Sequence, residues 1–161
     1  MYRKGAVVLT VTLIAGLLAG ASEARAAERT LEFQLVYKIM ESKRIEVPNV
    51  EGQSITQGTA FGVAVFKDGR SAVKDYVFVS NRSKDSTSQF GYSTYTFDDG
   101  STLTLSWTAG SKPGQPYHGE YKVLSGTGAY AGATGSGTFD PAPSKFKDAM
   151  VLNVKLHVNT P

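Results

Sequence analysis

The sequence has no cysteine, and among its 161 residues there are only two histidines and one tryptophan. Without cysteine the chain cannot form disulfides, thiolate nucleophiles or thiolate metal sites, so its hydrophobic core must stabilise the fold. The histidines, His118 and His157, lie far apart and have no partners at the spacing of metal ligands. A zinc site needs three or four such ligands, so we expect no metal.

The short motifs of common catalytic sites are also absent. The chain contains neither a G-x-S-x-G nucleophile segment nor a G-K-[ST] phosphate loop, so we expect no nucleotide or other cofactor. Asp98 and Asp99 are adjacent carboxylates, but their position before Gly100 is typical of a turn rather than of an acid–base pair. No catalytic residue can be assigned from these patterns.

One apolar run stands out, and it lies at the N-terminus. Two basic residues precede Ala6–Leu18, and Ala24-Arg25-Ala26 has small residues at the positions that a signal peptidase recognises. This arrangement predicts a signal peptide over residues 1–26. The run is too short to span a bilayer core of roughly 30 Å as a helix. We therefore expect an exported protein, periplasmic or extracellular, with a single domain at residues 27–161.

The charge of the chain is nearly balanced. Its net charge of +3 comes from 17 basic and 14 acidic residues, and removal of the predicted leader leaves 14 basic and 13 acidic ones. A net charge of this size gives no support to nucleic-acid or anionic-membrane binding.

Alternating apolar and polar residues predict strands along the whole remaining chain. Residues 30–41 place Leu31, Phe33, Leu35 and Tyr37 on one face, and residues 148–158 alternate in the same way. Further strands are predicted at residues 57–66, 73–80, 90–97, 101–108 and 117–125. Seven or eight strands at this spacing, without an amphipathic helix, indicate an all-β sandwich or barrel.

Two Asp-Gly pairs, Asp68-Gly69 and Asp99-Gly100, predict two-residue hairpin turns. A two-residue turn at Asp99-Gly100 also sets the register of its strands. That register gives three cross-strand pairs on one face: Thr96 with Leu103, Thr94 with Leu105, and Tyr92 with Trp107. The interior of an eight-stranded barrel has room for side chains or one small ligand. We therefore predict that this face lines a ligand pocket, with Tyr92, Thr94, Leu105 and Trp107 as candidates.

Residues 126–139 read GTGAYAGATGSGTF and contain five glycines. Glycine at this density among strand residues indicates positive φ angles or close backbone contacts, and it predicts a tight crossover before the last strands. The glycines of this structural motif are Gly126, Gly128, Gly132, Gly135 and Gly137. The segment resembles the G-G-x-G-x-F-x-G-A-x-G signature near the end of allene oxide cyclase and dirigent-like barrels.

Two further segments support the resemblance. LVYKIMESKR at residues 35–44 is similar to the V-Y-E-I-N-E-R-D-R segment that opens plant allene oxide cyclases, and Val158–Pro161 is similar to their closing G-T-P. The resemblance implies a calycin-like, eight-stranded antiparallel β-barrel with an apolar cavity, commonly a trimer.

The resemblance also implies where a ligand would bind. In the cyclases the Glu and Asn of Y-E-I-N polarise the substrate epoxide and its water inside the barrel, and this chain has Lys38 and Met40 at those positions. Lysine cannot replace the charge of a carboxylate, and methionine offers no comparable hydrogen bond. The resemblance therefore places Lys38 and Met40 in the lumen but argues against plant-type cyclase activity. Alternation instead places Phe33, Leu35 and Tyr37 inside.

Three functions stay open from the sequence. The first is an exported barrel that binds a small apolar or aromatic molecule in its lumen, or guides its coupling as dirigent proteins do. The second is an isomerase or cyclase that acts on an oxidised lipid. The third is a structural or protein-interaction barrel with a filled core.

Overall fold

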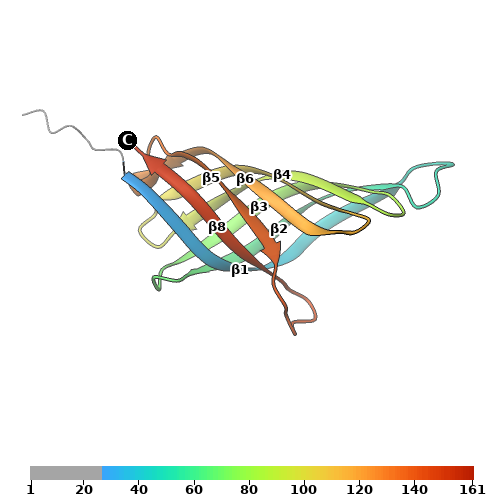
Figure 1. The fold of residues 1–161 in the computed structure, drawn as a ribbon, viewed down its shortest axis with the longest axis horizontal. Coiled ribbons are helices and arrows are strands. Elements are labelled where there is room, and N and C mark those ends of the chain that lie inside the picture. Colours follow the sequence, from blue (N-terminus) through green and yellow to red (C-terminus); the bar gives the residue numbers. More distant parts are fainter. Residues whose placement is uncertain (1–26) are drawn as a thin grey trace, which may run out of the picture.

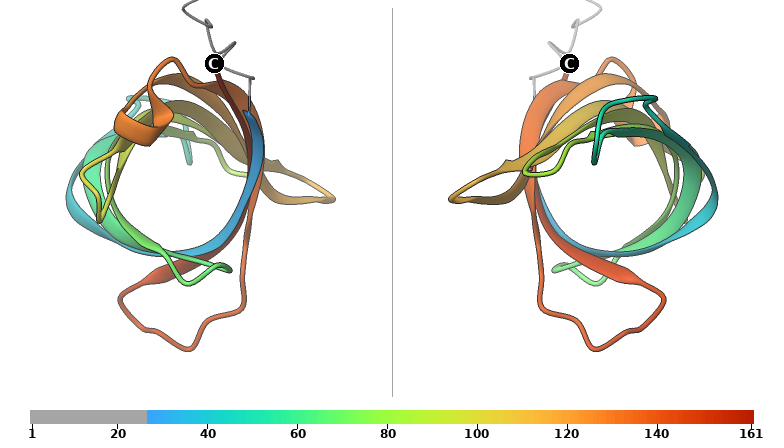
Figure 2. Two further views of the ribbon diagram at one scale, coloured as in Figure 1. Left: turned by 90° about the vertical axis from the view of Figure 1, so that its left-hand side faces the viewer. Right: turned by 90° about the vertical axis from the view of Figure 1, so that its right-hand side faces the viewer.

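The computed structural model describes residues 27–161, which form a closed barrel of eight antiparallel strands (Figures 1 and 2). The strands are β1 (Ala27–Glu46), β2 (Ser54–Phe66), β3 (Ser71–Arg82), β4 (Thr87–Phe97), β5 (Thr102–Lys112), β6 (Gln115–Thr127), β7 (Thr134–Pro141) and β8 (Met150–Thr160). Each strand pairs with its neighbour in sequence, and β1 pairs with β8 to close the barrel. The predicted eight-stranded antiparallel barrel is confirmed.

The predicted signal peptide lies outside the described residues, and no helix among those described is long and apolar enough to cross a membrane.

The first and last strands supply much of the core. In β1, Leu31, Phe33 and Leu35 are buried, as alternation predicts. In β8, Leu152, Val154, Leu156 and Val158 are buried in the same alternating manner. Phe33 lies opposite Val154 in the β1–β8 pair that closes the barrel. Apolar side chains of the first and last strands therefore pack together at this junction.

The two Asp-Gly hairpins have three-residue loops rather than the predicted two-residue turns. The Phe97 N–H donates to the Ser101 carbonyl (2.9 Å) and the Gly100 N–H donates to the Phe97 carbonyl (3.0 Å). In this loop only Gly100 has positive φ, +79°, whereas a type I′ turn requires positive φ at both central residues. The β2–β3 loop has the same hydrogen-bond pattern, with Gly69 at φ +90°.

The extra loop residue moves the predicted β4–β5 register by one position. Ser93 lies opposite Leu105 and Tyr95 opposite Leu103. Because side chains alternate along a strand, a one-residue slip exchanges the inner and outer faces of β4. Tyr95 and Phe97 are therefore buried in the barrel, 1% and 6% exposed.

The glycine-rich segment at residues 126–139 includes the end of β6, the turn to β7 and most of β7, and the tight connection predicted there lies at the rim of one end of the barrel (Figure 2). Gly128 and Gly132 have φ +57° and +69°; Gly128 begins the short 3-10 helix η1 (Gly128–Tyr130), and Gly132 lies in the turn that follows it. This turn directs Tyr130 inward, where its ring stacks on Phe97 with centroids 4.6 Å apart. The Arg70 Nη1 donates to the Tyr130 hydroxyl at 3.2 Å. The five glycines of the motif are distributed as Gly126 in β6, Gly128 in η1, Gly132 in the turn, and Gly135 and Gly137 in β7.

Candidate functional site

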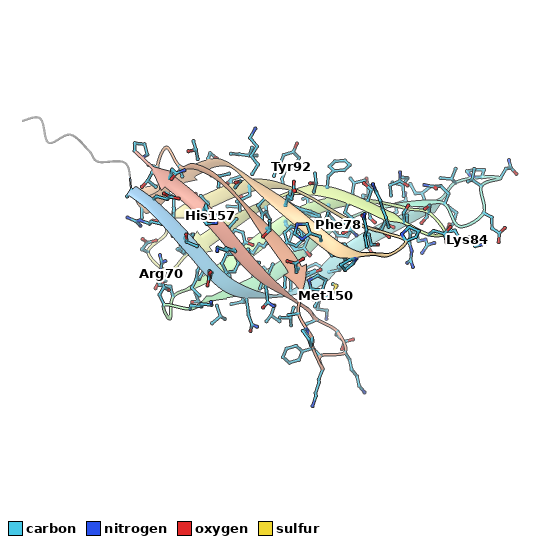
Figure 3. All side chains as sticks on the ribbon, in the orientation of Figure 1. Arg70, Phe78, Lys84, Tyr92, Met150 and His157 are labelled. Carbon is cyan, nitrogen blue, oxygen red and sulfur yellow. The ribbon has the colours of Figure 1, made fainter. Side chains whose placement is uncertain are left out.

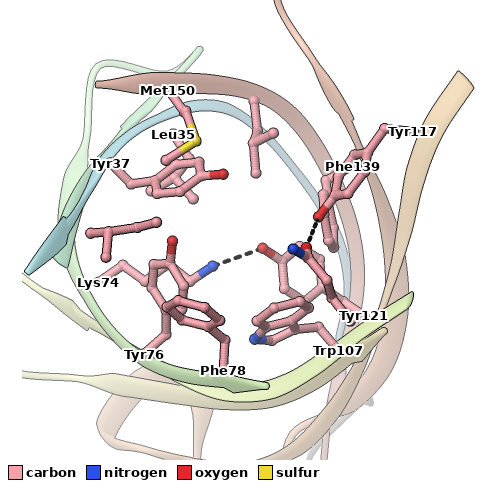
Figure 4. Close-up of a pocket in the computed structure, with 13 residues that line it drawn as sticks. Leu35, Tyr37, Lys74, Tyr76, Phe78, Trp107, Tyr117, Tyr121, Phe139 and Met150 are labelled. Carbon is pink, nitrogen blue, oxygen red and sulfur yellow. Dashed lines mark hydrogen bonds between the residues drawn. The ribbon is translucent and has the colours of Figure 1, made fainter. Parts of the chain in front are cut away.

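A cavity of about 90 Å³ lies inside the barrel (Figure 4), and Tyr130 is not one of its lining residues. Seven of the eight strands line it, and β2 is the exception. The cavity reaches the surface, since its lining includes Ile39 and Met150, which are 40% and 41% exposed. At the other end the rings of Phe66, Phe97 and Tyr130 pack together and are at most 6% exposed, so the lumen is filled there and accessible only at the Met150 end.

Small residues on β2 leave room for the side chains of other strands that line this cavity. Ala60 and Ala64 on β2 are buried and face inward with Gly62. A Cβ at Gly62 would lie 2.9 Å from the Leu35 Cδ1 atom, so even a methyl group there would crowd the lumen. On β4, Gly91 gives space to the indole of Trp107, which would lie 2.7 Å from an added Cβ. Glycine and alanine thus let aromatic rings from other strands fill the wall.

One charged side chain, Lys74 of β3, points into the lumen (Figure 4). Lys74 is only 3% exposed, and its Nζ donates a hydrogen bond to the Tyr121 hydroxyl at 2.8 Å. The same nitrogen lies 4.6 Å from the ring centroid of Tyr76, 5.2 Å from that of Tyr95 and 5.1 Å from that of Tyr121. None of the ion pairs within residues 27–161 includes Lys74. The amine therefore lies in an aromatic cage without a carboxylate partner.

Burial changes the protonation of these groups. Removal from water disfavours the charged ammonium, and it lowers the pKa of Lys74 to about 7. Burial raises the pKa of Tyr76, Tyr95 and Tyr121 above the usual value, so their hydroxyls stay protonated at neutral pH. Near pH 7 the lumen consequently holds an amine that is partly neutral beside phenol groups that can donate protons.

Hydroxyl groups form a short polar chain beside the amine. The Tyr95 and Tyr121 hydroxyl oxygens are 3.4 Å apart. Nearer the mouth, the Tyr117 hydroxyl donates to the Gln89 side-chain carbonyl. The Trp107 Nε1 is buried and has no hydrogen-bond partner among residues 27–161. The cavity therefore combines an apolar wall with a few polar groups, as small-molecule sites do.

Of the four lumen residues predicted from the Asp99-Gly100 hairpin, the structure places two inside and two outside. Leu105 is fully buried and Trp107 lines the cavity. Tyr92 is 55% exposed on the outside of the barrel (Figure 3), and the Thr94 hydroxyl pairs with that of Thr104 at 3.1 Å on the same outer face. The prediction for Tyr92 and Thr94 was wrong because the hairpin loop has one more residue than a two-residue turn.

Lys38 and Met40 also lie outside the lumen. Both are exposed, Met40 by 61%, whereas Tyr37 and Ile39 line the cavity. A bulge between Ile39 and Glu41 interrupts the pairing of β1 with β2 at Met40. The lumen placement implied by the family motif is therefore wrong, and the placement predicted from alternation is right.

Sequence reasoning missed Lys74, although the sequence carries a signal for it. Lys74 alternates with Tyr76 and Phe78 along the strand predicted at residues 73–80, and Ala72 continues the same apolar face just before it. A lysine on such a face is rarely buried unless it has a partner, so its presence there marks a special site.

A second apolar surface lies on the outside of β2, β3 and β4. Its large side chains are between 38% and 55% exposed: Phe61, Val63, Val65, Val73, Val77, Phe90 and Tyr92. Two pairs lie directly across the sheet, Val63 with Val73 and Val77 with Tyr92, and the exposed Asp75 lies opposite Phe61 between Val73 and Val77. We refer to these seven residues as the outer apolar face.

Comparison with known proteins agrees with the fold. No family model matches the chain, and no curated protein matches it. Among solved structures, it is similar to the pterocarpan synthase dirigent protein GePTS1, with a TM-score of 0.55 and 15% identity over 83% of this chain and 90% of that one. The pterocarpan synthase dirigent protein PsPTS1 gives a TM-score of 0.54 and 15% identity over 82% and 94% of the two chains. The chain therefore has a dirigent-type barrel fold.

Proposed function

We propose that the protein is an exported barrel that binds one small apolar or aromatic molecule in its lumen. The observation that carries this proposal is the cavity with aromatic walls, which is closed at the Tyr130 end and contains the buried Lys74 amine. A buried amine without a carboxylate is costly to maintain. An apolar side chain could fill this position at a lower cost, and a binding role explains why a lysine is found there.

The size of the cavity limits what it admits. Its volume of about 90 Å³ is below the roughly 150 Å³ of an apolar cavity that takes up benzene and the roughly 300 Å³ at which ordinary ligand pockets begin. A ligand therefore inserts one small end or displaces side chains at the mouth. Met150, an unbranched side chain that is 41% exposed, is suited to such displacement.

The structural neighbours favour a dirigent-like form of this function. Those neighbours are named as pterocarpan synthase dirigent proteins, and we propose that this barrel likewise orients a reactive aromatic molecule. A plant-type cyclase would require a carboxylate beside the substrate cation. The charged side chain in this lumen is a lysine, which favours binding or orientation over that activity.

A substitution at the mouth tests the proposal. Benzyl alcohol, a small aromatic probe, is expected to bind the protein with a Kd of about 1 mM or tighter. Met150→Trp fills the mouth and is expected to weaken this binding at least about tenfold, as measured by isothermal titration calorimetry.

The matched control is Met40→Trp, which adds the same side chain on the outer surface of β1. It is expected to leave the affinity unchanged. Equal loss in both variants, or no binding to the wild-type protein together with no small molecule in mass spectra of denatured preparations, would favour the filled structural barrel instead.

We also propose that the outer apolar face mediates assembly with further copies of the chain, a trimer by resemblance. Val77, which is 50% exposed, pairs with the exposed Tyr92 in this face. Burial of such side chains stabilises an interface by roughly 25 cal/mol per Å² of apolar surface. Val77→Lys is therefore expected to shift the mass measured by light scattering from oligomer to monomer.

A control variant separates this effect from general surface charge. Leu124→Lys adds the same charge at a residue on β6, outside the outer apolar face, that is 46% exposed. It is expected to leave the oligomer intact. A monomeric wild-type protein at micromolar concentration would refute the assembly proposal.

A further inference from the structure

Lys74 has the surroundings of a reactive amine as well as those of a binding group. Its Nζ faces the cavity, forms no ion pair with a carboxylate of residues 27–161, and donates a hydrogen bond to the Tyr121 hydroxyl at 2.8 Å. Lysines become nucleophilic when an apolar pocket removes them from water, because the neutral amine then gains population. The low pKa of Lys74, about 7 through burial, is in accord with this geometry.

We propose that Lys74 captures a small aldehyde or ketone, or the carbonyl end of a larger molecule, as an imine inside the lumen. This proposal rests on the proposed function, since the carbonyl compound must enter the cavity. The ligand is then a carbonyl compound, and the buried amine binds it covalently.

The reaction needs no oxidant, reductant or further reactant. The neutral Nζ attacks the carbonyl carbon, and a proton passes from nitrogen to the former carbonyl oxygen to give a carbinolamine. Loss of that hydroxyl as water, with one more proton, forms the C=N bond of a protonated imine. The Tyr121 hydroxyl is placed to donate this proton to the leaving oxygen, and water at the open end of the cavity replaces the proton that Tyr121 gives up.

The aromatic cage suits the product. A protonated imine keeps the positive charge close to the Lys74 nitrogen, where the Tyr76, Tyr95 and Tyr121 ring centroids lie within 5.2 Å. Ring faces attract a cation, and this attraction strengthens when water is removed. The same wall limits access of water, which slows hydrolysis of the imine.

Reductive trapping tests the proposal. The purified protein is incubated at pH 7.5 with butanal or benzaldehyde and sodium cyanoborohydride, which converts an imine into a stable secondary amine. Peptide mass spectrometry is expected to find at least tenfold more alkylation on Lys74 than on any exposed lysine. Benzyl alcohol, which has no carbonyl group, is expected to compete for the lumen and reduce alkylation of Lys74 alone.

Two variants and one unfolded sample serve as controls. Lys74→Arg keeps a cation but forms no such imine, and it should lose the selective adduct, whereas Lys38→Met on the outer surface should retain it. In urea the selectivity for Lys74 should disappear. If Lys74→Arg does not fold, the distribution of label in the wild-type protein still decides the question.

The outcomes separate this proposal from the proposed function. Selective alkylation of Lys74 supports imine capture. Alkylation of exposed lysines only, while benzyl alcohol still binds the lumen, overturns imine capture and leaves ligand binding intact. Absence of both the Lys74 adduct and benzyl alcohol binding overturns both proposals.

Discussion

Lys74→Met is expected to raise the free energy of unfolding at pH 6 by about 3 kcal/mol. Burial lowers the pKa of Lys74 from 10.5 to about 7, and each unit corresponds to about 1.4 kcal/mol, so the buried charge costs on the order of 5 kcal/mol. Methionine fills a similar space without charge. Loss of the hydrogen bond to Tyr121 and of the cation–ring contacts offsets roughly 2 kcal/mol of the gain.

The wild-type protein is expected to become more stable as the pH rises above 7, and Lys74→Met is expected to remove this rise. Between pH 7 and 10.5, folded Lys74 is largely neutral while the unfolded chain still binds the proton. The unfolded state therefore binds more protons in this window, and stability rises with pH by about 2–3 kcal/mol between pH 7 and 9. This contribution is lost as the pH falls through 7.

Above about pH 10 the buried tyrosines are expected to reverse this rise in stability. Burial raises the pKa of Tyr37, Tyr76, Tyr95, Tyr117 and Tyr121. Their neutral forms stabilise the folded state below the ordinary tyrosine pKa of about 10, and this stabilisation is lost as the pH rises beyond it. Urea unfolding of the wild-type protein and of Lys74→Met at pH 6, 7.5 and 9 stays below the pH at which the tyrosines ionise. The difference between the two proteins therefore measures the contribution of Lys74 to stability.

Lys122→Met on the outer surface of β6 is the matched control, and it is expected to change stability by less than about 0.5 kcal/mol. A Lys74→Met protein that is no more stable than wild type at pH 6, with an unchanged slope between pH 7 and 9, would show that the amine is solvated.

Tyr130→Ala is expected to destabilise the barrel by about 4 kcal/mol, in line with large-to-small substitutions of buried aromatic residues. The Tyr130 side chain is 1% exposed, stacks on Phe97 and fills the closed end of the barrel. Its removal leaves a cavity where the β6–β7 turn meets the wall. Chemical denaturation measures the loss.

Tyr130→Phe separates packing from hydrogen bonding at this site. It keeps the ring and removes only the contact with Arg70 at 3.2 Å, so a loss of about 1 kcal/mol or less is expected. Benzyl alcohol binding should be unaffected, because Tyr130 does not line the cavity. Equal destabilisation by both variants would mean that the Arg70 contact, rather than the ring, holds this end closed.

Much of the architecture could be predicted from sequence because it depends on local patterns. The alternation in β1 and β8 identified the buried faces, and the dense glycines identified the turn that carries Tyr130. Both features reflect steric rules that a single strand or turn obeys on its own.

The β4 face could not be predicted because it depends on the length of one loop. Asp99-Gly100 suits a two-residue type I′ turn, but it also suits a three-residue loop in which only the final glycine has positive φ. Asp98 occupies the additional position, and the difference of one residue moves Tyr92 from the lumen to the surface.

The two lysines show a different limit. Matching Lys38 to a family motif placed the wrong side chain in the lumen, because motif similarity does not fix which face of a strand points inward. Lys74 lies on a strand for which no motif was available. Its alternation with Ala72 and Tyr76 was the informative signal, and it required only the periodicity of the strand.

The most direct test of a ligand-binding lumen built around Lys74 is an NMR titration with ¹³C-labelled lysine, with and without benzyl alcohol. The predicted result is one lysine signal, absent in Lys74→Met, that titrates with a midpoint near pH 7 and shifts when benzyl alcohol binds. If the Lys74 signal instead titrates like the exposed lysines, near the ordinary value of about 10.4, and does not respond to benzyl alcohol, the account is contradicted.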